Sequence, residues 1–374
     1  MIEEREDKVV RKAFFALLRA GLWGESPEHS CFPLCPKEWS LLYIQACRQT
    51  VEGVIYDGLL LLEEEYLPPR ILLIKWTARI DAMERRNRWM NQMVGVLNQW
   101  FKENGIEAWL MKGQGIAAFY AQPLHRSCGD IDWFFPHPQD YEKAARLLKE
   151  YGVKVERQAG FSLTYSWNGF QVEHHSRLLD IHNPLVKGYL KKRMREEAVR
   201  PLLWKEEGKV VLLPSSMLMH VSVNAHILKH MLAFGIGIRQ LCDSARVCHR
   251  FHDAKEGALL KRVYRKAGIY RWIQLLNSLL VKELGMPESC LPFPLIAVGK
   301  TDWVLEEIWQ GGNFGFYDRR FGQEEGEARL KRKNVGRQYL RRMALHFRYA
   351  PWETCWFPVI QMYSRIYMKR KNDI

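Results

Sequence analysis

The chain has 374 residues, 47% of them hydrophobic and 26% charged, which excludes a disordered chain and fits a globular protein of two or three domains. Its formal net charge of +14 favours an anionic partner, such as a nucleotide, a nucleic acid, a phosphorylated sugar or an anionic membrane surface. The eight cysteines include no pair of CxxC units, which argues against a structural zinc site, and no apolar run is long enough for a transmembrane helix. Since the N-terminus has no signal-peptide pattern, we expect a reducing, cytoplasmic location.

The first hundred residues are expected to be helical, because apolar residues recur there at the spacing of one helix face. Proline and glycine separate the segments from one another. The longest segment carries Arg and Glu between its apolar residues, as expected of a helix with one solvated side. The predicted helices span 7–22, 37–50, 52–63 and 69–102, and together they define a first region, 1–100.

The pattern changes near Gly105, where short apolar runs of strand length begin to alternate with helical segments. Alternation of this kind predicts an α/β unit of domain size. The predicted strands are 106–111, 128–135 and 153–158, and the predicted helices are 116–121 and 136–152.

Two hairpins are predicted next. Asn168-Gly169, the strongest short turn signal, separates the alternating runs FSLTYSW and FQVEHHSRL. A second hairpin is centred on Glu206-Glu207-Gly208, after a predicted helix at 183–199. From Pro214 onward the pattern is helical again. We therefore expect an α+β protein, with a mixed core at 101–212 and a helical domain at 213–374.

Asp130 and Asp132 stand one residue apart in the otherwise apolar run CGDIDWFF. Successive strand side chains point to opposite faces, so the two carboxylates share one face and Ile131 takes the other. Carboxylates are rarely buried without a partner. A pair on one face can bind hard divalent cations, and a two-metal site stabilises the attacking and leaving oxygens of phosphoryl transfer. We therefore predict that both aspartates bind Mg²⁺ or Mn²⁺.

A third carboxylate is expected on the first hairpin, at Glu173. In FQVEHH, Glu173 and His175 take one face, whereas Val172 and His174 take the other. If this strand pairs beside CGDIDWFF, Glu173 lies next to the two aspartates and completes the metal site. The two histidines flank the acid, and either is a candidate to orient it.

The turn in WLMKGQG is the candidate phosphate-binding element. A predicted strand ends at Lys112-Gly113, and a helix begins just after Gly115. Backbone N–H groups at glycine turns and helix N-termini bind phosphates. Lys112, and Arg126 four residues before the first aspartate, supply positive charge that would neutralise a triphosphate.

Together these residues resemble the signature of the nucleotidyltransferase superfamily related to DNA polymerase β, in which a glycine turn after the first strand precedes two aspartates on the second. The chain is most similar to a bacterial family usually called uncharacterised nucleotidyltransferases. The resemblance covers roughly residues 100 to 250. Its members share an lKG turn, an arginine shortly before GDIDhhh, and an acid–His pair on a later strand, which here are Leu110 to Gly113, Arg126, Gly129 to Asp132, and Glu173-His174.

One residue departs from the superfamily pattern. Gln114 occupies the position of a serine whose hydroxyl would contact phosphate. This departure keeps open, as an alternative, a nucleotidyltransferase-like scaffold or peripheral membrane protein without activity.

The resemblance continues in a later helical segment. His226 and His230 lie four residues apart on one helix face. Zinc binding is not favoured, because no third ligand is evident, so we expect these histidines to pack or to contact nucleotide. Arg239 and Asp243 have the spacing of a salt bridge within one helix. The family pattern H…KH…g…R…D corresponds here to His226, Lys229, His230, Gly235, Arg239 and Asp243.

The resemblance implies a nucleotidyltransferase-type mixed β-sheet core between helical regions, and transfer of a nucleotidyl group from an NTP, such as ATP, to an acceptor with release of pyrophosphate. It also implies an association with polysaccharide biosynthesis, and hence a sugar- or lipid-linked acceptor. On this interpretation Asp130 and Asp132 bind both Mg²⁺ ions, and Glu173 binds the catalytic ion and activates the acceptor. The implied nucleotide-binding residues are Lys112, Gly113, Gln114, Arg126, Gly129, His226, Lys229 and His230.

The basic charge admits two other interpretations. A nucleic-acid-binding protein is an alternative, but it is not favoured because the Lys and Arg residues are dispersed along the chain. The C-terminal stretch is aromatic and basic, and either packs on the protein or lies on a membrane surface with its basic residues towards anionic lipid. We expect packing. The residues concerned are Trp352, Trp356, Phe357, Ile360, Tyr363, Tyr367, Lys369, Arg370 and Lys371.

Overall fold

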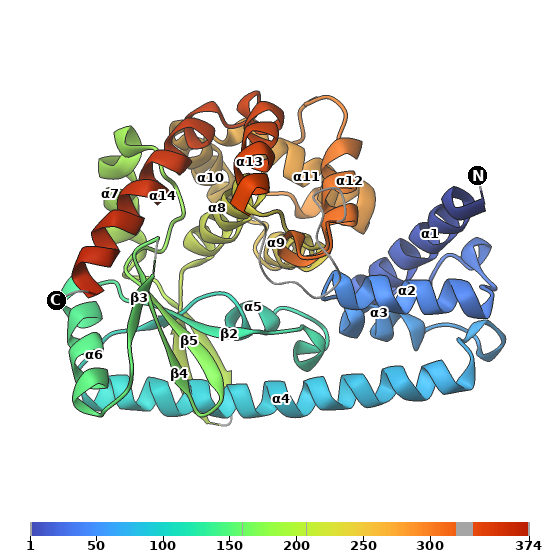
Figure 1. The fold of residues 1–374 in the computed structure, drawn as a ribbon, viewed down its shortest axis with the longest axis horizontal. Coiled ribbons are helices and arrows are strands. Elements are labelled where there is room, and N and C mark those ends of the chain that lie inside the picture. The colour runs from blue at the N-terminus through green and yellow to red at the C-terminus, as the bar shows by residue number, and fades with distance from the viewer. Residues whose placement is uncertain (1, 159, 207, 319–331, 373–374) are drawn as a thin grey trace.

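A long helix underlies much of the molecule. In the computed structural model, which describes residues 2–158, 160–206, 208–318 and 332–372, this helix runs the length of the view in Figure 1. Its predicted range, 69–102, is confirmed to within one residue at each end. The other predicted N-terminal helices are also present, with shifted ends. The observed bounds are α1 Ile2–Trp23, α2 Pro36–Arg48, α3 Glu52–Leu59 and α4 Arg70–Glu103.

Within the described residues, seven strands form one mixed sheet in the order β3-β4-β5-β2-β1-β7-β6. The pairs β2–β5 and β1–β7 are parallel, and the other neighbours are antiparallel. The predicted α+β class is therefore correct. The strands are β1 Trp109–Leu110, β2 Asp130–Phe134, β3 Glu156–Gln158, β4 Ser162–Trp167, β5 Phe170–His175, β6 Leu202–Glu206 and β7 Lys209–Leu213.

Both predicted hairpins form. At the tip of β4–β5, Asn168 and Gly169 have φ angles of 45° and 83°, the positive values that a tight hairpin turn requires at both central positions. The β6–β7 hairpin turns at Gly208, whose φ is 77°, while Glu207 lies outside the described residues. The sequence pattern did not predict that β7 pairs in parallel with β1, more than a hundred residues earlier in the chain.

Helix α4 covers one face of the sheet with aromatic contacts. The ring centroids of Phe101 and Trp133 are 5.1 Å apart, and those of Trp89 and Phe170 are 4.9 Å apart. The alternating residues of β2 and β5 that face α4 are therefore apolar or buried, whereas the intervening residues point away from it. This alternation assigns Asp130 and Asp132 to the face opposite α4.

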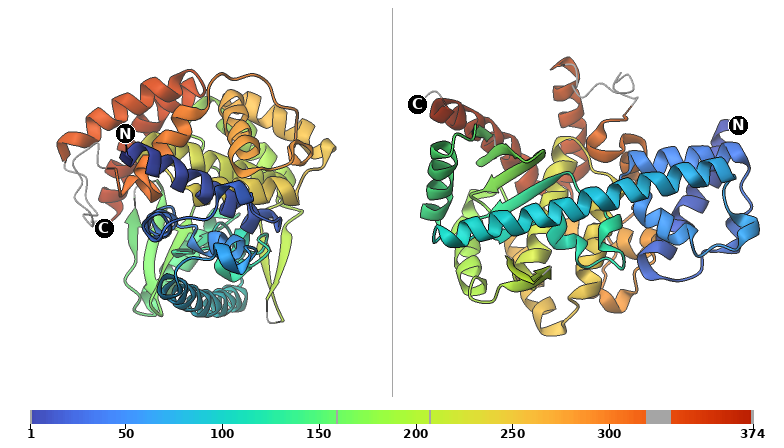
Figure 2. Two further views of the ribbon diagram at one scale, coloured as in Figure 1. Left: turned by 90° about the vertical axis from the view of Figure 1, so that its right-hand side faces the viewer. Right: turned by 90° about the horizontal axis from the view of Figure 1, so that it is seen from below.

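The C-terminal helices lie on that opposite side, as the views in Figures 1 and 2 show. Near the sheet, the predicted helix 116–121 is replaced by a single turn, α5 Gln114–Ala117, and the predicted helix 136–152 is present as α6 Pro138–Glu150. The remaining helices are α7 Lys187–Glu197, α8 Ser216–Ala233, α9 Ile238–Arg250, α10 Ala254–Ala267, α11 Tyr270–Leu284, α12 Asp302–Gly311, α13 Arg332–Phe347 and α14 Pro351–Asn372.

The N-terminal and C-terminal helices share one hydrophobic core. The indole of Trp23 donates a hydrogen bond to the Leu284 carbonyl at 2.6 Å, and the rings of Phe14 and Trp309 lie 5.1 Å apart. Buried residues of all three predicted regions belong to a single cluster. The boundaries at residues 100 and 212 remain a prediction about domain organisation.

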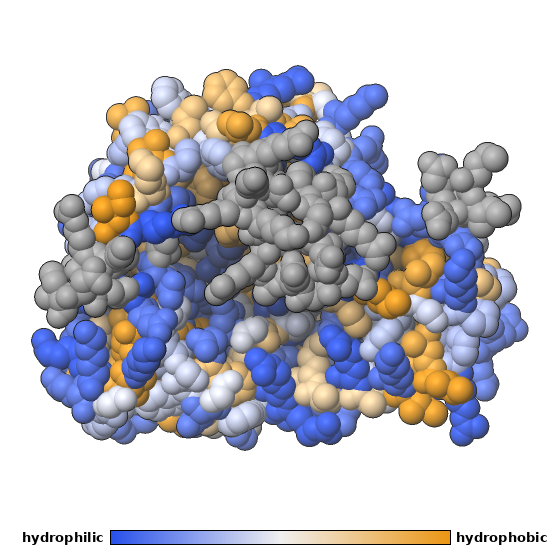
Figure 3. All heavy atoms as spheres, viewed as in Figure 1, coloured by the Kyte–Doolittle hydropathy of each residue, from blue (hydrophilic) through white to orange (hydrophobic). Residues whose placement is uncertain are grey.

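Helix α14 packs with only part of its aromatic surface. Phe357 is buried against the His182 ring, whereas the apolar residues Trp352, Val359, Met362 and Ile366 are exposed. Apolar side chains are accordingly visible along this helix in Figure 3. Within the described ranges, no helix combines the length and the apolar character needed to cross a bilayer. The side chains of Lys369, Arg370 and Lys371 lie outside the described part of the chain.

Candidate functional site

The register of β2 and β5 sets the geometry of the candidate site. The two strands are parallel neighbours, and Asp132 is paired with Glu173 and Asp130 with Gln171. Because Glu173 alternates with the α4-facing residues Val172 and His174, it lies on the same face of the sheet as the aspartates. The structure therefore brings Glu173 beside Asp132.

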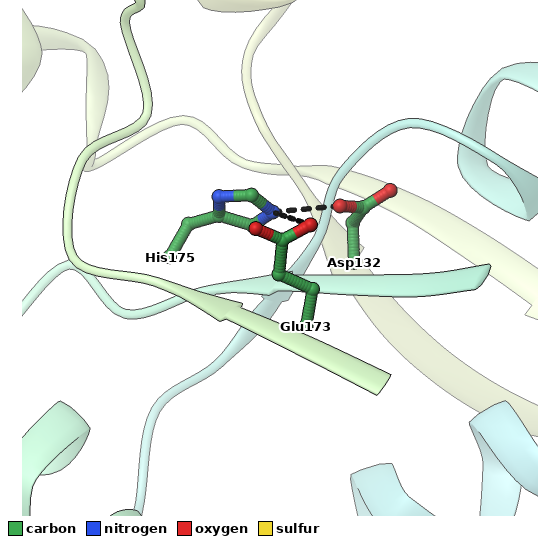
Figure 4. Close-up of side chains that lie close together, drawn as sticks. All are labelled: Asp132, Glu173 and His175. Atoms are coloured by element: carbon green, nitrogen blue, oxygen red, sulfur yellow. Dashed lines mark hydrogen bonds and ion pairs between the residues drawn. The ribbon is translucent and has the colours of Figure 1, made fainter. Parts of the chain in front are cut away.

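Figure 4 shows Asp132, Glu173 and His175 pointing toward one another. The His175 Nε2 atom lies 2.6 Å from Asp132 Oδ1 and 3.7 Å from Glu173 Oε2. One ligand atom from each of the three side chains lies within 4.8 Å of the others. The sequence pattern predicts His175 only as a candidate to orient the acid, although its i,i+2 spacing from Glu173 places both side chains on one face.

His174, the second residue of the acid–His pair in the family pattern, lies on the other face of the sheet from the carboxylates. His174 faces α4, and its Nε2 atom is 2.9 Å from the hydroxyl of Tyr165. Burial, with a smaller contribution from His175, lowers the pKa of His174 to about 3. His174 is thus a neutral core residue, and His175 is the histidine that contacts the acids.

The two aspartates have opposite electrostatic environments. The negative charge of Asp132 is the main cause that raises the pKa of Asp130 to about 6. For Asp132, burial favours the protonated form, but the charge of Lys112 and the hydrogen bond from His175 outweigh it and lower its pKa. The Lys112 ammonium lies 3.8 Å from Asp132. Lys112 therefore pairs with the Asp132 carboxylate as well as adjoining the glycine turn.

The glycine turn lies directly against β2. Gly113 has φ 53° and ψ −119°, a backbone conformation that favours glycine, and a Cβ atom there would lie 3.3 Å from the Asp130 carbonyl oxygen. Gln114 is buried, and its Nε2 donates to Asn91 Oδ1 on α4 at 3.0 Å. The side chain that replaces the superfamily serine thus fixes the turn to α4. Gly129 has open space around its Cβ direction, so packing does not require glycine there.

Arg126 is not placed among the carboxylates. Its buried guanidinium donates from Nε and Nη2 to the two oxygens of Asp243 on α9, at 2.8 and 2.6 Å. Tyr120 donates to the same carboxylate at 2.8 Å. Arg239 forms its hydrogen bond with the Ser127 carbonyl, so the predicted salt bridge between Arg239 and Asp243 is wrong. The reason is that a buried bidentate pair satisfies both charges better than a pair along one helix.

The predicted residues of α8 converge on an acid that sequence reasoning missed. His226 Nδ1 lies 2.9 Å from Asp180 Oδ2, and the Lys229 ammonium lies 3.0 Å from Asp180 Oδ1. Asp180 follows β5 and belongs to no motif, so no local signal identified it. Burial raises its pKa, but Lys229 and His226 outweigh this and lower it well below the usual value. His230 makes an edge-to-face contact with His226, with 4.2 Å between the ring centroids.

The donor set of the cluster fits a divalent cation. Two carboxylates and one imidazole are close enough to share an ion, and Asp130 shares their face of the sheet. Carboxylate oxygens suit Mg²⁺ and Mn²⁺, and imidazole is acceptable to Mn²⁺ and other transition metals. Asp132, Glu173 and His175 are therefore the residues that would hold a metal, rather than the three carboxylates alone.

A separate surface cavity of about 510 Å³ lies at the other end of the sheet. It is lined by Ile106 and Ala108, which precede β1, and by His137, which follows β2. The carboxylates lie at the opposite end of both strands. This cavity is therefore no part of the candidate site.

Comparisons with known proteins identify the family of the chain. The comparison with curated proteins found no match. A solved structure, an antigenic nucleotidyltransferase-like protein from Paracoccidioides brasiliensis, is 15% identical and superposes with a TM-score of 0.32, over 52% of this chain and 91% of that one. The family model described as "Uncharacterised nucleotidyltransferase" matches residues 36–282, well over half of the chain. The chain therefore belongs to the family of uncharacterised nucleotidyltransferases.

Proposed function

We propose that this protein is a divalent-metal-dependent nucleotidyltransferase, which moves a nucleotidyl group from an NTP to a hydroxyl-bearing acceptor. In this reaction the acceptor oxygen attacks the α-phosphorus, and the bond from that phosphorus to the β-phosphate bridging oxygen breaks. Pyrophosphate leaves with the electron pair, and the acceptor proton passes to a base. One observation carries the proposal: in a chain of this family, the parallel register of β2 and β5 pairs Asp132 with Glu173.

The proposed roles follow from position. Asp132, Glu173 and His175 hold the metal, and Asp130, on the same face of the sheet, is a fourth ligand. A bound divalent cation would neutralise phosphate charge and make the acceptor oxygen more acidic. Glu173 has a side chain 28% exposed, so it can also accept the acceptor proton.

The nucleotide is proposed to lie between the sheet and the C-terminal helices. Lys112 and the turn at Gly113, with Gly129 beside Asp130, contact its phosphates from the sheet side. His226, Lys229 and His230 approach from α8. Two residues receive changed roles. Gln114 and Arg126, whose side chains bind Asn91 and Asp243, position the site rather than touch the nucleotide.

The test uses NTPs labelled at the α-phosphate, because that phosphate stays with the transferred group. Each of the four NTPs is incubated with the protein, Mg²⁺ or Mn²⁺ and a cell extract, and label in macromolecules is measured. Glu173→Gln is expected to lower transfer by about 100-fold or more, since it removes a metal ligand and a base. Fractionation of the labelled products tests the sugar- or lipid-linked acceptor that the family resemblance implies.

The matched control is Glu156→Gln. Glu156 is exposed on the edge strand β3 and is joined to Glu173 only through Thr164 in the register of the sheet, so its loss should leave transfer unchanged. Equal labelling by wild type and Glu173→Gln would reject the catalytic role of Glu173. If no NTP labels any acceptor, the protein is instead a scaffold with a nucleotidyltransferase fold.

A further inference from the structure

Four of the cationic residues in the sequence pattern, Lys112, Arg126, Lys229 and Arg239, lie near the candidate site, and the first three have a carboxylate partner. Lys112 lies 3.8 Å from Asp132. Arg126 pairs with Asp243, and Lys229 pairs with Asp180. These ion pairs already compensate the three positive charges within the protein.

Arg239 is the exception. Among the described residues, no carboxylate oxygen lies within the 4.0 Å ion-pair distance of its guanidinium. Its Nη1 donates one hydrogen bond, to the Ser127 carbonyl at 2.6 Å, and its buried Nε has no partner in the described part of the chain. The side chain is only partly exposed. A largely buried guanidinium without an anionic partner is costly, because the protein replaces only part of its hydration.

Arg239 lies close to the strand that carries the two aspartates. Its hydrogen bond fixes it to the loop just before β2, three residues from Asp130. The charges of Arg239 and Asp130 act on one another, although the two groups are too far apart to form an ion pair. Burial is the main cause that lowers the pKa of Arg239, followed by the charge of Arg126. Two guanidinium groups are thus held near each other, and the one carboxylate that acts on both charges, that of Asp243, is paired with Arg126.

The Arg126–Asp243 pair leaves Arg239 as the arginine that can bind an anionic ligand. By pairing with Arg126, Asp243 fixes α9 to the loop that carries Asp130, and it leaves Arg239, one helical turn earlier, without a carboxylate. Arginine binds phosphate oxygens well because its N–H groups form a planar fork. We infer that Arg239 binds the β- and γ-phosphates of the NTP, in the role that the sequence pattern assigned to Arg126. This inference rests on the proposed nucleotidyltransferase function.

The test measures how affinity depends on the number of phosphates. Binding of Mg²⁺ with inorganic tripolyphosphate, with each of the four NTPs and with AMP is followed by calorimetry. Arg239→Gln is expected to weaken tripolyphosphate and NTP binding by about tenfold or more, and to change AMP binding less than about twofold. If the role of Arg239 were purely structural, its substitution would weaken the binding of tripolyphosphate, the NTPs and AMP to a similar extent.

The matched control is Arg246→Gln. Arg246 lies on the same helix, and its guanidinium also donates to backbone carbonyls, those of Phe119 and Leu22. The Arg246→Gln variant should therefore still bind tripolyphosphate and NTPs more tightly than AMP. If Arg239→Gln does not fold, Arg239→Lys decides, because lysine keeps the charge but not the fork. Wild-type NTP affinity in either folded Arg239 variant overturns the inference. A wild-type protein that binds neither tripolyphosphate nor any NTP refutes the proposed function itself.

Discussion

Asp243 has two arginines, Arg126 and Arg239, as candidate ion-pair partners. The arginine with which it pairs determines which one is left without a carboxylate. From the sequence, Arg239 is the obvious partner, because it lies one turn away on the same helix. The structure pairs Asp243 with Arg126 instead, 117 residues away. Spacing along a helix predicts only local pairs, whereas partner choice in a buried site depends on tertiary packing. For the same reason the sequence identified Glu173 but not Asp180.

The buried pair gives a stability prediction. Both side chains are almost completely buried, with 6% of Arg126 and 7% of Asp243 exposed. Asp243→Asn leaves the Arg126 charge buried without compensation, so it should lower the free energy of unfolding by about 3 kcal/mol. Urea denaturation measures this difference. Asp302→Asn, which removes a solvent-exposed partner of Lys282, should have little effect, and a similar small effect of Asp243→Asn would show that Arg126 finds another partner.

Elements with local signals were predicted well, and long-range strand pairing was not. Helix α4 has a repeated apolar face, and the β4–β5 hairpin has Asn-Gly at its turn, so both follow from neighbouring residues. The pairing of Trp109 with Leu212 joins β1 to β7 across a hundred residues, and no turn signal specifies it. In place of the helix predicted at 116–121, the chain forms the single turn α5, which ends at Ala117.

A buried histidine joins three elements and gives a pH prediction. His125 lies between Asp57 of α3, at 2.5 Å, and Glu84 of α4, at 2.8 Å. Burial lowers its pKa, but these two carboxylates outweigh burial, so the pKa is raised. A raised folded-state pKa means that the stabilisation is complete below the unfolded value of about 6.5 and is lost as the pH rises through the folded value.

The measurement compares wild type with His125→Gln by urea unfolding between about pH 6 and about pH 8.5. The stability advantage of wild type should be largest at the acidic end and should shrink as the pH rises. An advantage that grows with pH would mean that the neutral imidazole is the stabilising form.

At the scale of the whole molecule, the N-terminal helices are packed into the same core as the C-terminal ones. Leu17 on α1 is fully buried, whereas Leu60 after α3 is 58% exposed. Leu17→Ala should therefore lower the free energy of unfolding by about 3 kcal/mol, and Leu60→Ala by less than about 0.5 kcal/mol. With a shared core, circular dichroism and tryptophan fluorescence should report one coincident transition for Leu17→Ala. Two separated transitions would support the predicted boundary at residue 100.

Asn87 and Asn91 of α4 lie one helical turn apart and each hold a different loop of the site. Asn87 donates to the carbonyls of Leu124 and Arg126, and Asn91 accepts from Gln114. A single continuous helix therefore fixes the spacing of the two loops, at a rise of about 6 Å between the asparagines. Neither loop can move away from the other without breaking its contact with α4. A ligand that contacted both loops would meet groups already held in place, so little conformational entropy would be lost on binding.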